Sequence, residues 1–527
     1  MTRPGRRGLV AAAAALWFCA LAAFAVWTRG PLLREGLWID EAISAFVAES
    51  PTVSEFLFRN RTSDYTPPLF NVLLAGYTRV AGADEMPLKL FAFAWGVLAA
   101  AAGVALAAEL GGLLAAAMAA AFLVNNPILI DMSTELRSYS LSAFLAATSL
   151  TAVFRMRRRE PPPARGAWVL LTLLLVLLVY SHVVGLLVVA VLFLWSLREW
   201  RARPDRPFGR RLAVCAFVAG AAFLPWLPTT VRQTRIGLPW EKPLTTAEFL
   251  HSFRVRTGEM LPIDGGFEQP VFVLGLAAVL GAFVLGRRRL RPGPGDDSVP
   301  LVVTAAVGVT IWLVLGLYTA QSSRYLIVPA VLASALFAAA LARFLRACRT
   351  LDRPLRFAAA AGVVALVVAS FAARRDFYSG RFDVAQRPKS GLRTLCRNPA
   401  VGEDRLVVIS PDYFGPSAWY YCANPGRLRG FANWDKPFLF DPTRDGELWG
   451  NRAAASVALS QLERDLRARN ADSFVLVREV APAGLLPHFA AQVQAFDALL
   501  AGRFDERVIG RYPGRADSVT AYELRRR

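Results

Sequence analysis

The sequence predicts a polytopic α-helical membrane protein that carries a C-terminal α/β domain, and three observations support this fold class. Of its 527 residues, 55% are hydrophobic, and the mean hydropathy is +0.38, whereas soluble domains are about 45–50% apolar. Several apolar runs reach the length of about 20 residues that crosses a bilayer. After residue 373 the pattern changes to short buried strands between helical segments.

About eleven apolar segments are long enough, or nearly so, to cross a bilayer as helices. They lie near residues 8–28, 87–108, 110–125, 139–156, 167–182, 183–197, 211–228, 270–286, 300–319, 324–345 and 356–373. The first follows Arg3, Arg6 and Arg7 as a signal peptide would, and residues 23–25 resemble a cleavage site. Because its apolar run exceeds the about 7–15 residues of a cleaved signal, we favour a retained anchor.

The net charge of +20 comes from arginines that gather in alternate connections between the apolar segments. Clusters occupy residues 3–7, 155–165, 198–211, 287–291 and 343–356, whereas 125–138 and 319–323 hold almost no cations. This asymmetry is the positive-inside pattern, so we expect the N-terminus and the arginine-rich loops in the cytoplasm of a plasma-membrane or inner-membrane protein. The pattern explains the charge without a nucleic-acid partner, and we expect none.

We expect a transmembrane domain over residues 1–373, with a functional outer loop at 29–86, and an extracytoplasmic α/β domain over 374–527. Within the second domain, residues 405–410 and 473–478 read as buried strands, and 453–469 and 485–500 have helical periodicity. Cys396 and Cys422 also fall there. A disulfide between them suits an oxidising compartment, and two unpaired structural thiols are an equal alternative.

Ionisable residues are rare inside the apolar segments and gather at their predicted outer ends, which favours a site at one membrane face. The first group, Asp40 and Glu41, follows the first span. Two adjacent carboxylates suit a general base for an acceptor hydroxyl or a ligand for a divalent cation. An acidic helix start, in which Asp40 caps a helix from Glu41 to Glu49, is an equal alternative.

Further polar groups follow in order along the chain. They are Asp64 with Pro67 and Pro68, Glu85 with Lys89, Glu135 with Arg137 and Tyr139, Tyr180 with His182, and Arg324 with Tyr325. Each has a plain structural alternative, namely a rigid turn before a span, a surface ion pair, or a set of interfacial anchors. Taken singly, none of them indicates a function.

Together, the order of these groups resembles the C-type (GT-C), polyprenyl-phosphate-dependent membrane glycosyltransferases, which include the protein O-mannosyltransferases and the enzymes that add aminoarabinose to lipid A. Those proteins carry, in this order, an Asp-Glu pair, an Asp-x-His-Pro-Pro-Leu-type segment, a Glu near the second span, and Glu-x-Arg-x-Tyr, Tyr-Thr-His and Arg-Tyr-Leu stretches. The resemblance covers residues 30–345. It departs at Thr66, where His is common, at Lys89, where Arg is expected, and at Ser181, where Thr is usual.

The resemblance implies an inverting transfer of a sugar from a polyprenyl-phosphate donor to a hydroxyl of an acceptor lipid, protein or polysaccharide on the extracytoplasmic face. Asp40, with Glu41 beside it, is expected to supply the general base, and Arg137 and Arg324 are expected to stabilise the leaving phosphate. The other residues of the groups are expected to bind substrate. Mg²⁺ or Mn²⁺ is a candidate cofactor, with Asp40 and Glu135 as its ligands.

Other functional classes fit the sequence less well. A transporter or flippase for a lipid-linked saccharide is the main alternative, but it needs polar groups near the bilayer midplane, which the apolar segments lack. A receptor does not need so many spans, and a phosphatase needs a His or Asp nucleophile. In the outer connection 229–269, Trp240, Glu241 and Lys242 are a candidate lid over bound substrate, with a packed loop as the default alternative.

Overall fold

The computed structural model describes residues 3–527 except 65, 160–162, 204–206, 237–243, 262–297, 319–322, 373–387, 403, 411–413, 423, 431–433, 435–451, 480–486 and 516–517. The chain divides into two compact units. The helical unit comprises Met1–Pro31, Ala92–Pro225 and Leu244–Arg381, and the mixed unit comprises Leu32–Phe91, Trp226–Pro243 and Phe382–Arg527. Most of the predicted outer loop therefore folds with the C-terminal segment, and the predicted boundary at residue 373 stays a prediction.

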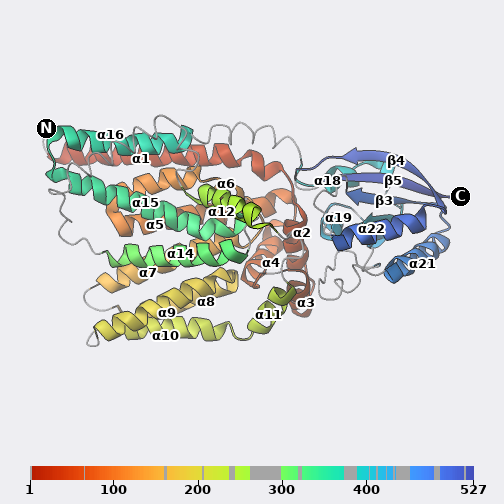
Figure 1. The fold of residues 1–527 in the computed structure, drawn as a ribbon, viewed down its shortest axis with the longest axis horizontal. Coiled ribbons are helices and arrows are strands. Elements are labelled where there is room, and N and C mark those ends of the chain that lie inside the picture. The colour runs from red at the N-terminus through yellow and green to blue at the C-terminus, as the bar shows by residue number, and fades with distance from the viewer. Residues whose placement is uncertain are drawn as a thin grey trace. The chain divides into compact units, whose positions relative to one another are not determined.

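The helical unit contains α1, most of α5, and the helices from α6 to α10, α12 and α14 to α16 (Figure 1). Their bounds are α1 Arg3–Arg29, α5 Glu85–Asn125, α6 Pro127–Met132, α7 Tyr139–Arg158, α8 Arg165–Ser181, α9 Val184–Ala202, α10 Phe208–Ala222, α12 Thr246–Met260, α14 Val299–Tyr318, η3 Ser323–Leu326, α15 Ile327–Ala347, η4 Cys348–Thr350 and α16 Arg353–Ala372. The first and the last of the predicted apolar segments, 8–28 and 356–373, thus correspond to helices α1 and α16.

Four of the described helices are long and apolar enough to cross a membrane, or five if one bent pair counts as a single span. They are Ala15–Arg34, Glu85–Asn125, Arg324–Thr350 and Arg353–Ala372, and the pair Phe208–Ala222 and Leu227–Gln233 bends by 65°. The predicted count of about eleven spans stays a prediction. The segment predicted at 270–286 lies outside the described residues.

Helix α5 joins two predicted segments, 87–108 and 110–125, into one element of 41 residues. The helix is interrupted at Gly112, whose φ of 74° and ψ of −170° are not helical. Glycine adopts a positive φ without the steric cost that a Cβ brings, so the break falls at this residue.

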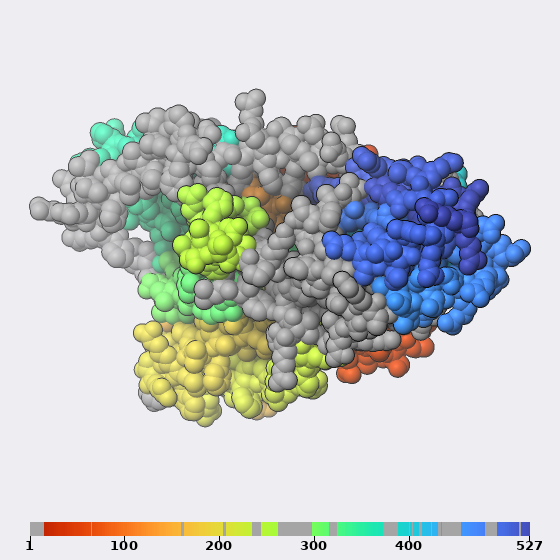
Figure 2. Space-filling view, turned by 45° about the vertical axis from the view of Figure 1, so that its right-hand side comes forward, coloured from red at the N-terminus to blue at the C-terminus, as the bar shows by residue number. Residues whose placement is uncertain are grey.

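Close helix packing accounts for the many alanines and glycines of the helical unit. Helices α1 and α16 lie side by side, with the rings of Phe24 and Phe371 5.3 Å apart (Figure 1). A Cβ built on Gly111 of α5 would lie 2.9 Å from the Cα of Ala339 in α15, so these two backbones approach closely. Helices α8, α9 and α10 pack against one another and form one continuous yellow surface (Figure 2).

The mixed unit combines the helices of the first loop with the C-terminal sheet and its covering helices. The loop contributes α2 Ile39–Ala48, α3 Val53–Ser63 and α4 Leu69–Ala81, and α11 Leu227–Ile236 joins them. The C-terminal segment contributes α18 Gly391–Cys396, β1 Val407–Ser410, α19 Gly415–Tyr421, β2 Leu428–Gly430, α21 Arg452–Ala468, β3 Ser473–Glu479, α22 Pro487–Leu500, β4 Phe504–Tyr512 and β5 Val519–Arg526. The strands predicted at 405–410 and 473–478 coincide with β1 and β3.

The five strands form one mixed sheet in the order β2-β1-β3-β5-β4. Strand β1 runs parallel to β2 and β3, with Val408 opposite Leu476, whereas β5 runs antiparallel to β3 and β4. Side chains alternate between the two faces of a strand. Val408 and Leu476 therefore pack in the core under α21 and α22, and Val407 packs in a second core with α18 and α19.

Candidate functional site

The predicted Asp40–Glu41 pair lies at the start of α2, in the mixed unit. The helix begins at Ile39 and its N-cap residue is Trp38, so the alternative in which Asp40 caps a helix starting at Glu41 is wrong. The Glu41 carboxylate accepts a hydrogen bond from the Trp38 backbone N–H at 3.2 Å and thereby satisfies one free donor of the helix start. Asp40 is half-buried in the first turn, where the helix dipole favours a carboxylate.

Glu41 is fully buried and forms ion pairs with two lysines. Its Oε1 accepts from Lys89 Nζ at 2.5 Å, and its Oε2 accepts from Lys389 Nζ at 2.9 Å. The Lys89 side chain is also fully buried, and that of Lys389 is 7% exposed. A buried charge is tolerated when it is paired, and each oxygen of the Glu41 carboxylate binds an ammonium group. The role of Asp40 as the base stays a prediction.

The predicted turn around Asp64 is built by hydrogen bonds to its carboxylate. Thr66 donates to Asp64 Oδ1 from its backbone N at 3.1 Å and from its hydroxyl at 2.9 Å, and Asn71 Nδ2 donates to Oδ2 at 2.8 Å. Asp64 and Asn71 are buried. Thr66, which stands where the resembling family commonly has His, is a partner within this turn. The turn leads through Pro67 and Pro68 directly into α4.

Glu85 and Lys89, one helical turn apart at the start of α5, bind different partners. The Glu85 carboxylate accepts from the guanidinium of Arg393 in α18, and Lys89 binds Glu41. Nearby, the Tyr420 hydroxyl donates to the carbonyl of Ala83 at 2.9 Å. Glu85 and Lys89 therefore do not form the simple surface pair that was one alternative, and each binds another segment of the mixed unit.

The helical unit brings together three other predicted groups in an aromatic cluster, which we define as Tyr139, His182 and Tyr325. Tyr139 begins α7, His182 follows α8, and Tyr325 lies in η3 before α15. The ring centroids are 5.8 Å apart for Tyr139 and His182, 5.9 Å for Tyr139 and Tyr325, and 6.4 Å for His182 and Tyr325. Three helix ends thus meet at residues that are 43 or more positions apart in the sequence.

Two arginines accompany the aromatic cluster. The Arg324 guanidinium lies over the Tyr325 ring, 5.2 Å from its centroid, and Arg137 is buried two residues before Tyr139. His182 Nδ1 accepts from the Val184 backbone N–H at 3.2 Å, so the neutral ring carries its hydrogen on Nε2. Guanidinium groups beside aromatic rings are suited to phosphate oxygens, which match their planar donors.

The predicted metal ligands do not form a cluster within the part of the chain that the structure describes. No three or more His, Cys, Asp or Glu side chains are placed there to hold an ion together. Asp40 belongs to the mixed unit and Glu135 to the helical unit. A site for Mg²⁺ or Mn²⁺ therefore stays a prediction. The candidate lid at residues 240–242 lies outside the described residues.

Sequence reasoning missed the C-terminal residues that contact the first loop. Lys389 binds Glu41, Arg393 binds Glu85, and the Tyr421 hydroxyl bonds to both the backbone N–H and the carbonyl of Leu37. No motif in the sequence marks these three positions. The burial of Lys389 marks it as a functional candidate, and that burial can be seen in the structure but not in the sequence.

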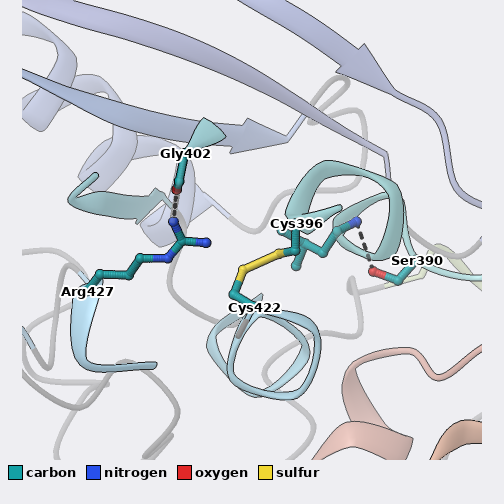
Figure 3. Close-up of a disulfide and its surroundings, with 6 residues drawn as sticks. Ser390, Cys396, Gly402, Cys422 and Arg427 are labelled. Carbon is teal, nitrogen blue, oxygen red and sulfur yellow. Dashed lines mark hydrogen bonds between the residues drawn. A yellow bond between two sulfur atoms is a disulfide. The ribbon is translucent and has the colours of Figure 1, made fainter. Parts of the chain in front are cut away.

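A disulfide links the ends of the two helices that carry Arg393 and Tyr421. Cys396, at the end of α18, pairs with Cys422, at the end of α19, and their Cα atoms are 5.0 Å apart (Figure 3). This spacing falls within the range of about 4.4–6.8 Å that disulfides require. Of the two alternatives left open by the sequence, the structure shows the paired cysteines.

Comparisons with solved structures identify the fold. ArnT from Cupriavidus metallidurans in the apo state superposes with a TM-score of 0.54 at 15% identity, over 97% of this chain and 98% of that one. The same protein bound to undecaprenyl phosphate gives 0.52 over 96% and 98%. Archaeal oligosaccharyltransferase AglB from Archaeoglobus fulgidus, in complex with an inhibitory peptide and a dolichol-phosphate, gives 0.52 at 14% identity over 94% and 73%.

Both proteins are GT-C enzymes, so the chain has the fold of the GT-C glycosyltransferases that the sequence resemblance predicted. By sequence, the chain matches no protein-family model and no curated protein. At these identities the likeness concerns the fold alone.

Proposed function

We propose that this chain is an inverting glycosyltransferase that moves a sugar from a polyprenyl-phosphate donor to an acceptor hydroxyl on the extracytoplasmic face of the membrane. One observation carries the proposal: nearly the whole chain shares its fold with ArnT, which has been solved bound to undecaprenyl phosphate. The Asp-Glu pair and the arginines beside the aromatic cluster supply the groups that such a reaction needs. The N-terminus is cytoplasmic in this proposal, and the C-terminal domain is extracytoplasmic.

Asp40 is the proposed general base. Its carboxylate takes the proton of the acceptor hydroxyl while that oxygen forms a bond to the anomeric carbon of the sugar. The bond between this carbon and the phosphate oxygen breaks, and polyprenyl phosphate leaves with the electron pair. Direct displacement inverts the anomeric centre, and its transition state resembles an oxocarbenium ion, as in glycosidases. General-base catalysis typically contributes about 10²–10⁴-fold.

Arg137 and Arg324 are proposed to stabilise the leaving phosphate. Charge that develops on phosphate oxygens is stabilised most by fixed donors in a water-poor site. Burial of Arg137 and packing of Arg324 on Tyr325 restrict both guanidiniums. The remaining predicted residues, from Asp64 to Glu85 and from Glu135 to His182, shape the substrate site in this proposal.

Binding of Mg²⁺ or Mn²⁺ by Asp40 or Glu135 stays a separate proposal. It is tested by assaying transfer after chelation with EDTA and after adding back each ion. Activity that EDTA leaves unchanged contradicts this metal role.

The experiment for the proposed function follows donor consumption by purified protein in liposomes, with a panel of radiolabelled polyprenyl-phosphate sugars and an envelope extract as acceptor. Transfer of label from one lipid donor to acceptor, with release of polyprenyl phosphate, is expected. A transporter or flippase for lipid-linked saccharides is the alternative, and it would move the intact donor between leaflets. Movement of the donor without cleavage of its sugar–phosphate bond would overturn the glycosyltransferase proposal.

A further inference from the structure

The start of α2 is bound by C-terminal residues at several independent points. Lys389 Nζ donates to Glu41 at 2.9 Å, and the Lys389 backbone N–H donates to the carbonyl of Glu35 at 2.7 Å. The Glu35 carboxylate, which is buried, binds Arg515 at 2.6 Å. The same short stretch of loop therefore has ionic and backbone contacts to two separate C-terminal segments.

Tyr421 fixes the backbone immediately before α2. Its hydroxyl accepts from the Leu37 N–H at 2.5 Å and donates to the Leu37 carbonyl at 3.0 Å. Burial raises the pKa of this hydroxyl well above its usual range, so it keeps its proton. Gly36 has a φ of 82°, and a Cβ there would lie 2.7 Å from the Tyr421 hydroxyl. The chain thus needs glycine at this position both for its conformation and for the approach of Tyr421.

We propose that Lys389 and Tyr421 are positioning residues for Asp40, acting through Glu41 and through the backbone at Leu37. Asp40 directly precedes Glu41 in the first turn of α2, so any rotation or fraying of that turn moves its carboxylate. The inference rests on the proposed function, in which Asp40 is the base. In this inference, the C-terminal domain helps to position the base, a task separate from selecting the acceptor.

The electrostatics of this contact distinguish Lys389 from an ordinary surface lysine. Its side chain is 7% exposed and its partner Glu41 is 0% exposed, so solvent screens their attraction little. A lysine in a solvent-exposed ion pair contributes little to stability, whereas removing one partner of a buried pair costs several times more. Loss of Lys389 therefore changes the environment of Glu41 more than loss of a surface charge would.

The test compares Lys389→Met, Lys389→Arg and Tyr421→Phe in the full-length protein with Arg429→Met as the matched control. Arg429 forms a partly buried ion pair with Asp465 in the same domain, at 2.6 Å, and that pair involves no residue of the first loop. Two readouts are needed: kcat and KM for the lipid donor, and hydrogen–deuterium exchange of the peptide that contains residues 37–48.

For Lys389→Met we expect kcat to fall by about 10–100-fold with little change in donor KM, because a displacement of about 1 Å of a reacting group has that effect. Amides of α2 should exchange faster, since opening of this turn becomes easier. Lys389→Arg should keep kcat and α2 exchange closer to their wild-type values, because arginine keeps the positive charge. Tyr421→Phe should give a smaller change in the same direction, and Arg429→Met should leave α2 exchange unchanged.

Each contrary result has a distinct meaning. Unchanged α2 exchange in Lys389→Met overturns the positioning proposal whatever the activity. Faster exchange with an unchanged kcat also overturns it, because the contact would then be structural only. If the wild-type protein consumes no polyprenyl-phosphate sugar, the proposed function fails, and the exchange experiment still decides whether Lys389 orders α2.

Discussion

The start of α2 in the mixed unit and the aromatic cluster in the helical unit are stabilised in different ways. In the mixed unit, the start of α2 is held by buried ion pairs in which Glu41 shares its carboxylate between Lys89 and Lys389. In the helical unit, the aromatic cluster of Tyr139, His182 and Tyr325 is held by ring contacts at helix ends. Ion pairs therefore stabilise the start of α2, whereas packing of aromatic rings stabilises the cluster.

In the proposed function, this difference corresponds to a division of tasks. A general base must be held in place, and the buried ion pairs of Glu41 hold the helix turn that carries Asp40. A site for a lipid phosphate needs cations, and the proposed ones are Arg324, which packs on the Tyr325 ring, and the buried Arg137. Mutations in the two regions should therefore differ in whether they affect stability or substrate binding.

The largest expected effect on stability comes from Glu41→Ala. The substitution removes the carboxylate that two buried ammonium groups share, and breaking a buried pair in this way costs about 3–5 kcal/mol. The matched control is Glu55→Ala, because Glu55 pairs with Arg59 at a more exposed site on α3. That change should cost at most about 0.5 kcal/mol. Thermal unfolding in detergent measures both, and equal Tm values would contradict the role of Glu41.

The next largest effect is expected from the disulfide. Replacing Cys396 and Cys422 together with serine should destabilise the mixed unit by about 2–4 kcal/mol, because the disulfide limits the freedom of the unfolded chain. Cys19, a free and exposed cysteine in α1, offers the control Cys19→Ser. Limited proteolysis of the C-terminal segment is the measurement. Equal protection of the double variant and the control would show that the disulfide contributes nothing.

In the helical unit, Arg137→Lys and Arg324→Lys should weaken donor binding while the fold persists. A hydrogen bond to a charged group contributes about 1.5–3 kcal/mol, so donor KM should rise by about 10–100-fold where the guanidinium geometry is lost. Arg158→Lys is the control, since Arg158 pairs with Glu109 at the exposed end of α7. A rise in KM for the control equal to that of the other two variants would contradict specific phosphate recognition.

The smallest effect is expected at the aromatic cluster itself. Tyr325→Phe keeps the ring and should leave Tm nearly unchanged, whereas Tyr325→Leu removes the ring contacts and should cost about 0.5–1.5 kcal/mol. The two variants are compared by thermal unfolding. A larger loss for Tyr325→Phe than for Tyr325→Leu would mean that the hydroxyl, and not ring packing, holds the cluster together.

The sequence predicted features that have local patterns. Asp40 and Glu41 lie in the first turn of a helix, although Asp40 is not its N-cap as one alternative required. Strands lie where β1 and β3 were predicted, and the aromatic cluster unites three groups that the family order had joined. The GT-C fold followed from the order of the polar groups. Each of these predictions rests on a short stretch of sequence or on a series of such stretches.

The sequence did not predict contacts between distant segments. Lys389 lies 348 residues after Glu41, and one lysine in a loop has no pattern that indicates burial. Trp38 is the N-cap residue although Asp is usually preferred there, and its backbone N–H donates to the Glu41 carboxylate. Strand β4 was also missed, since Asp505, Glu506 and Arg507 conceal its alternation.

The measurement that tests the central claim most directly is transfer from a consumed polyprenyl-phosphate sugar by Asp40→Asn. Asp84→Asn, which changes an exposed aspartate of the same loop, is the matched control. Both variants must show wild-type folding by Tm. We predict that Asp40→Asn lowers kcat by about 10²–10⁴-fold while Asp84→Asn behaves as wild type. Equal transfer by Asp40→Asn and wild type would contradict this prediction, because Asp40 would then not be the base.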